Sequence, residues 1–256
     1  SIFVPIYLYS LHFSIPYIIL FSLIGHIGSV LFALPATQVV RFAGPKYAIL
    51  ISTPFLIAFY LGLRELTPTV TWLFFILPLA VATRSVLYNI CFELNFIKHA
   101  TRSRIGNTLS IIAIISIMAG IVSPFLAGFL IALFGYSSLF LIGSTILILS
   151  TVPLLLSEED HKTIEFKTHN FFQFISARVY RPWALSFTGY AIESSIGRII
   201  WPVFLVIILY NTEKVGAVVA LSAFITVVIL SFIGHLADRF NSRKLLRFGT
   251  MLYFFG

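Results

Sequence analysis

Three charged residues lie inside long apolar runs, and these residues have the chemistry for a binding site. Arg84 occurs in "ATRSVLYNI", and Glu193 and Arg198 occur in "YAIESSIGRIIW". A charge in apolar surroundings must be compensated by a partner, a ligand or water, so each is a candidate for solute binding or ion coupling. Two arginines against one glutamate favour an anionic solute.

Aromatic residues accompany these charges at helical spacing. Tyr88 follows Arg84 by one turn, and Tyr190 and Trp201 flank the other two charges. They are expected either to contact solute or simply to pack. The candidate solute or coupling residues are therefore Arg84, Tyr88, Tyr190, Glu193, Arg198 and Trp201.

His26 lies among small residues in "GHIGS". Since the pKa of an unperturbed histidine is near neutrality, this side chain is suited to relaying protons. The alternative is a structural hydrogen bond to a neighbouring helix.

The elements that hold these residues are indicated by the composition. Hydrophobic residues make up 59% of the chain and charged residues 10%, and the mean hydropathy is +1.02, values that predict an all-α polytopic membrane protein. A soluble helical protein would need polar stripes that "IIAIISIMAGIVSPFLAGFLIALFG" lacks. Because about 20 apolar residues cross a bilayer, we expect seven full spans and two partial ones, at 1–15, 17–40, 48–63, 69–96, 105–133, 137–156, 183–209, 215–237 and 246–256.

Several functional classes find no support in the sequence. There is no phosphate-binding Gly-Lys-Ser/Thr loop, no histidine pair at zinc spacing and no nucleophile elbow, so no enzyme activity, cofactor or metal is expected. The net charge of +8 is spread over short strips rather than one face, which argues against nucleic-acid binding. The single Cys91 lies in an apolar run and is expected to pack there.

Positive charge between the spans predicts the orientation. Arg64 and Lys214 lie on one side, and thirteen residues lie on the other. Connectors rich in Lys and Arg stay cytoplasmic, so the second side is expected inside. Its residues are Arg41, Lys46, Lys98, Arg102, Arg104, Lys162, Lys167, Arg178, Arg181, Arg239, Arg243, Lys244 and Arg247.

One connector, 157–182, is longer than the others and carries both signs of charge. It suggests a boundary between two bundles, at 1–156 and 183–256. Phe171, Phe174, Ile175 and Arg178 recur at helical spacing, so part of it is expected either to lie in the membrane interface or to be a solvated linker. Both chain ends look cut.

With the connectors placed, "GHLADRFNSRKLL" resembles the signature loop of the major facilitator superfamily. Gly234, Asp238, Arg239, Arg243 and Lys244 match that pattern. Asn241 replaces the usual glycine, and asparagine tolerates a left-handed turn. The resemblance implies ion pairs that form in one conformation and break in another. The alternative is a plain positive-inside loop.

Two further segments are similar to patterns of the same superfamily. "ATQVVRFAGPKY" echoes the signature loop through Arg41, Gly44 and Lys46 but lacks its acid. "AGIVSPFLAG" is similar to the fifth-helix motif of the superfamily's antiporters, although a packing role alone is the alternative. Its key positions are Ala119, Ser123, Pro124, Ala127 and Gly128.

The resemblance implies a fragment from late helix one to early helix nine of two pseudo-symmetric six-helix halves. It implies a secondary transporter that works by alternating access and is coupled to protons, with an efflux antiporter as one form of this, and a monomer spanning the plasma membrane. Its partners would be the lipid bilayer, a small solute and protons. A non-transporting receptor or scaffold and an intramembrane enzyme are the alternatives. We also expect Arg84 and Glu193 to pair between the halves in at least one state.

The orientation can be tested with single cysteines in a Cys91→Ala background. Cysteines at Lys46 and Arg243 should react with an impermeant thiol reagent from the cytoplasmic side only. Cysteines at Glu65 and Lys214 should react from the outside only. Labelling of Arg243 and Lys214 positions from the same side would contradict the assigned topology.

Overall fold

The computed structural model describes residues 3–67, 71–99, 105–157, 178–239 and 249–251. The assigned elements in these ranges are helices, which confirms the all-α prediction. They are α1 (Phe3–Ser10), α2 (Ile15–Glu65), α3 (Thr71–His99), α4 (Ile105–Leu156), α6 (Arg181–Leu209) and α7 (Thr212–Arg239). The boundaries 1–156, 157–182 and 183–256 remain predictions.

At two positions where the sequence predicts a connecting loop, the helix is interrupted only at a single glycine. Gly44 in α2 has φ 81° and ψ 161°, and Gly135 in α4 has φ 75° and ψ 174°. Glycine adopts this conformation without a Cβ penalty. The expected connectors at 41–47 and 134–136 are therefore helical except for one residue, and this detail of the prediction was wrong.

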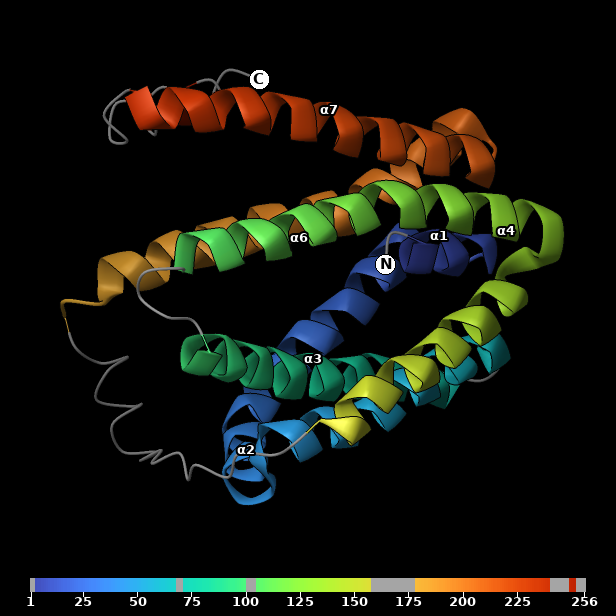
Figure 1. Cartoon of the computed structure of the whole chain (residues 1–256). Helices are drawn as coiled ribbons and strands as arrows, with labels where there is room; N and C mark the ends of the chain where they lie inside the picture. Colours follow the sequence, from blue (N-terminus) through green and yellow to red (C-terminus); the bar gives the residue numbers. More distant parts are fainter. Residues whose placement is uncertain (1–2, 68–70, 100–104, 158–177, 240–248, 252–256) are drawn as a thin grey trace.

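Length explains why those helices must be broken. An unbroken helix of 51 residues would be about 75 Å long, more than twice the hydrocarbon thickness of a bilayer. Each glycine divides its helix into two segments of membrane-spanning length. Figure 1 shows α4 crossing the molecule, turning and returning beside the second segment of α2.

The outer surface of the helices is apolar. Within the described residues, four helices are long and apolar enough to cross a membrane: α2, Trp72–Phe96 of α3, Ile115–Leu156 of α4 and Ala184–Leu209 of α6. Between 11% and 33% of their most apolar windows is buried inside the protein. A protein in water rarely exposes so large an apolar surface, and this surface therefore faces lipid.

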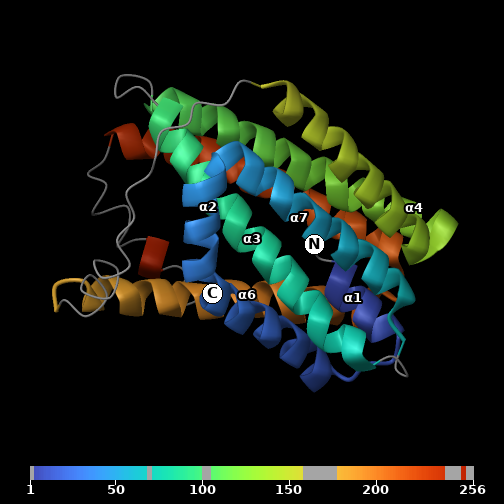
Figure 2. The same cartoon turned by 90° about the horizontal axis from the view of Figure 1, so that it is seen from below.

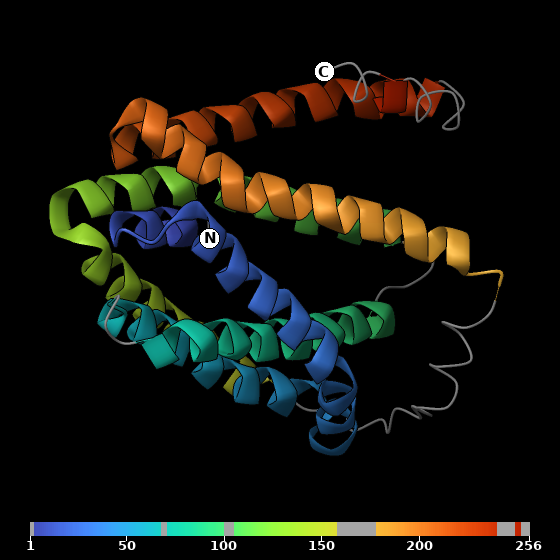
Figure 3. The same ribbon diagram turned by 180° about the vertical axis from the view of Figure 1, so that it is seen from behind.

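The helices pack as two groups that meet around α1. The second segment of α2 packs along α3, and α7 packs along the first segment of α4 (Figures 1 and 3). The short α1 contacts α6, and Figure 2 shows it enclosed among the longer helices. The shared core draws residues from α1, α2, α3, α4 and α6.

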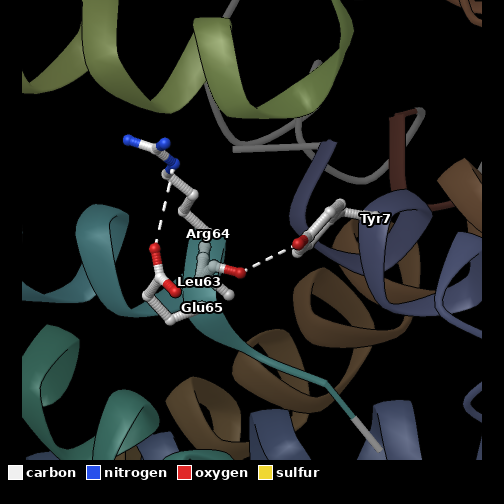
Figure 4. A network of polar contacts seen from close by, with 4 residues as sticks. All are labelled: Tyr7, Leu63, Arg64 and Glu65. Carbon is white, nitrogen blue, oxygen red and sulfur yellow. Dashed lines mark hydrogen bonds and ion pairs between the residues drawn. The ribbon is translucent and has the colours of Figure 1, made fainter.

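Tyr7 ties this core to the end of α2. Its hydroxyl donates a 2.9 Å hydrogen bond to the backbone oxygen of Leu63 (Figure 4), and its ring lies 5.0 Å from the rings of both Tyr136 and Phe140. The same oxygen also accepts from the Leu66 N–H at 3.2 Å, so this carbonyl in the last turn of α2 has two donors in the apolar core. The neighbouring Arg64–Glu65 pair, at 3.9 Å, is exposed and contributes little.

α4 and α7 meet backbone to backbone. A Cβ added to Gly216 would lie 2.5 Å from the Pro124 oxygen, and one added to Gly128 would lie 2.8 Å from the Thr212 oxygen. Small residues permit this close approach of the two backbones. In lipid, where no hydrophobic effect drives helices together, the resulting dispersion contacts stabilise the helix pair.

Gly216→Ala should therefore destabilise the protein, by about 1–3 kcal/mol, because backbone atoms must move to admit the methyl group. Thermal unfolding in detergent measures the effect. Gly120→Ala is the matched control, since a Cβ at Gly120 meets nothing within 4 Å. Equal melting temperatures for the two variants would contradict the close contact.

Candidate functional site

A cavity of about 530 Å³ lies between α1, α2, α3 and α6. Its volume is in the range of small-molecule sites. Its polar lining includes His26, Arg84, Arg198, Tyr60 and the serines Ser22, Ser29, Ser85 and Ser195. Apolar side chains including Phe21, Leu56, Phe59 and Ile199 form the rest of the wall.

His26 links α2 to α6 across this cavity. Its Nδ1 is 2.7 Å from the Ser22 carbonyl oxygen, and its Nε2 is 3.2 Å from the hydroxyl of Ser195. A carbonyl only accepts, so Nδ1 carries a proton. The Ser195 hydroxyl also lies 2.7 Å from the Ala191 carbonyl, so its single proton serves either that carbonyl or the Nε2 of His26. The expected alternative, a hydrogen bond to a neighbouring helix, is confirmed.

Arg84 is half-buried on α3 and rests on an aromatic ring. Its guanidinium carbon is 4.1 Å from the centroid of the Tyr88 ring, a cation–π contact. The Tyr88 ring stacks in turn near Phe92, 6.2 Å between centroids. This contact orients the guanidinium and leaves its charge without a carboxylate among the described residues.

Arg198 is held along α6 by its own helix. Its Nε donates to the Ser194 carbonyl at 3.0 Å, and its Nη2 donates to the Ser194 hydroxyl at 2.8 Å. The other guanidinium nitrogen, Nη1, makes no hydrogen bond among the described residues, and the side chain is exposed and lines the cavity. Arg84 and Arg198 thus contribute to one site from two different helices.

The remaining sequence candidates lie outside the cavity lining. Glu193 is exposed and is two residues before Ser195, about 200° around the helix. Tyr190 is 69% exposed and Trp201 is 56% exposed, with the Trp201 ring 5.6 Å from that of Phe204. In this conformation Glu193 makes no ion pair with Arg84, and their pairing in another state remains a prediction.

The sequence interpretation missed the serines of the site. Ser22, Gly25, His26 and Ser29 recur at the spacing of one helix face, and all line the cavity. A polar stripe in an otherwise apolar span was the signal that pointed to them.

The motif residues fall partly outside the described residues. Arg243 and Lys244 lie outside them. Gly234, Asp238 and Arg239 belong to α7, but their surroundings and the side chains of Asp238 and Arg239 are also outside the described part. The conformational role of this loop therefore remains a prediction. The predicted interfacial segment at 171–178 also lies outside them, apart from Arg178.

The fifth-helix motif lies in the first segment of α4. Pro124 and Gly128 face α7, and Ala127 packs beside the cluster formed by Ile131 and Val215. The Ser123 hydroxyl donates to the Ala119 carbonyl of its own helix. The motif therefore contributes to a helix–helix contact, and its link with antiport is a separate hypothesis.

Comparison with known proteins gives the family. The family model described as Major Facilitator Superfamily matches residues 1–256. The chain belongs to the Major Facilitator Superfamily. It is therefore a membrane transporter of that superfamily, as the motif resemblance predicted. The search of curated proteins and that of solved structures found no match.

The predicted ion pair of this superfamily member has a direct test. Arg84→Glu and Glu193→Arg in the full-length protein should each abolish solute flux, and the double swap should recover part of it, because paired residues are energetically coupled. Flux into proteoliposomes measures the three variants. A double variant no better than the worse single variant would mean that the two residues do not pair in any transport state.

Proposed function

We propose that this superfamily member is a secondary active transporter that moves a small solute by alternating access around the cavity. One observation carries the proposal: Arg84 of α3 and Arg198 of α6 line a common cavity among membrane-spanning helices. Charged side chains among membrane-spanning helices are costly unless they bind a ligand or line a water-filled path. The cavity also lies between helices that we assign to the two halves, 1–156 and 183–256.

Proton coupling is part of this proposal, and His26 is its titratable group. When Nε2 gains a proton it becomes a donor, so Ser195 must change from donor to acceptor toward it. The Ser195 hydroxyl then donates to the Ala191 carbonyl, 2.7 Å away, a hydrogen bond whose geometry is already present. Protonation would thus reverse the direction of the hydrogen bond between α2 and α6, and this supports a coupling between proton binding and the relative position of the halves.

Other groups around His26 act on the same equilibrium. Arg84 and Arg198 line the same cavity as His26, so a bound anion and a proton on His26 would interact with each other. Solute and proton would then bind cooperatively.

Further details belong to the same proposal. Asp238 and its basic neighbours would form the conformational latch, and the α4–α7 contact would serve an antiport mechanism. The protein would act as a monomer, since the cavity is formed within one chain. Its location would be the plasma membrane.

Reconstituted full-length protein tests transport and coupling together. We expect a pH-sensitive dye trapped in proteoliposomes to report proton movement when a transported solute from a small panel is added. His26→Asn should abolish solute accumulation driven by a pH gradient and leave solute exchange without a gradient intact.

His12→Asn is the matched control for this experiment. His12 lies outside the cavity and has φ 66°, a conformation that asparagine tolerates, so coupling should persist. Accumulation that survives in His26→Asn would rule out this histidine as the coupling group. Specific solute binding without any flux would favour a receptor instead of a transporter.

A further inference from the structure

We infer that the cavity is a site for a small organic anion, whose carboxylate or phosphate oxygens are bound by Arg84 and Arg198. This inference rests on the transport function proposed above and names its substrate class. The two arginines would bind the anion from α3 and from α6, so that one ligand connects both helices.

The charge of the lining is the first argument. It includes two arginines and one histidine, and no aspartate or glutamate among the residues that the structure describes. The acids with described side chains, Glu65, Glu93, Glu193 and Glu213, lie elsewhere. The described lining therefore carries a net positive charge in largely apolar surroundings, and a bound anion would compensate it.

Free hydrogen-bond donors are the second argument. Arg84 rests on the Tyr88 ring, and within the described residues its N–H groups bond to no carboxylate or carbonyl. Arg198 retains N–H groups beyond the two that Ser194 occupies. A planar guanidinium presents parallel N–H groups that match the two oxygens of a carboxylate or phosphate.

Two of the four lining serines do not compete for this role. The Ser29 hydroxyl donates to the Gly25 carbonyl at 2.9 Å, and the Ser195 hydroxyl is within reach of the Ala191 carbonyl and His26. The Ser22 and Ser85 hydroxyls could add neutral donors, but only the arginines supply charged hydrogen bonds, which are the stronger ones for an anion.

Size and wall chemistry distinguish an organic from an inorganic anion. A cavity of about 530 Å³ is far larger than one inorganic ion requires. Apolar side chains such as Leu56, Phe59 and Ile199 would cover a carbon skeleton while the arginines bind its charged group.

Equilibrium binding to the purified full-length protein tests the inference. Succinate and glycerol phosphate are the charged probes, with succinamide and glycerol as their neutral counterparts. We expect calorimetric binding of at least one charged probe and none of its neutral counterpart. The charged probe that binds more tightly identifies the preferred group as carboxylate or phosphate.

Variants then assign the binding to the two arginines. Arg84→Gln and Arg198→Gln should each weaken binding on the order of tenfold to a hundredfold, since each removes charged hydrogen bonds. Arg84→Lys should also weaken binding, because it keeps the charge and loses the planar fork. Arg64→Gln is the control, an identical change at a residue outside the cavity that should leave affinity unchanged.

The melting temperature of each variant separates lost binding from lost folding. Arg198 is exposed, and its hydrogen bonds to described residues stay within its own helix, so its variant should fold even if that of Arg84 does not. Unchanged affinity in a folded Arg198→Gln, or equal binding of charged and neutral probes, would overturn the inference. If an anion binds but no flux is measured, the anion site stands and the proposed transport function is wrong. If a neutral solute is transported and its flux is unchanged in Arg84→Gln and Arg198→Gln, the transport function stands and the anion site is wrong.

Discussion

Hydrocarbon cannot solvate a polar group, and this constraint governs the whole structure. The backbone meets it by forming helices, whose internal hydrogen bonds leave only the ends unsatisfied. At the end of α2, the Leu63 oxygen accepts from both the Leu66 N–H and the Tyr7 hydroxyl inside the core. At the end of α4, Lys46 donates to the carbonyls of Leu155 at 3.1 Å and Ser157 at 2.5 Å.

The same constraint decides where charge and close packing occur. Arg84 and Arg198 are acceptable because they line a cavity and make cation–π or hydrogen-bonding contacts, rather than facing lipid. Where no polar group is available, α4 and α7 gain contact by bringing glycine backbones together at Gly128 and Gly216. The structure thus separates a polar site between the helices from an apolar surface around them.

Much of this organisation was predictable because membrane helices follow simple rules of length and hydropathy. The spans, the family and the position of Arg84 and Arg198 within apolar runs all follow from the sequence. Side-chain direction was harder to predict, because Glu193, Tyr190 and Trp201 share a helix with Arg198 but lie outside the cavity lining. Contacts between distant segments, such as His26 with Ser195, depend on tertiary packing that a single sequence does not specify.

The one-residue connections at Gly44 and Gly135 have a consequence for how the protein is made. A segment that already spans the bilayer holds its neighbour at the interface, with no loop long enough to keep it in water. A one-residue connection therefore favours insertion of the two segments together, as a helical hairpin. A side chain at either glycine would strain the turn on which that hairpin depends.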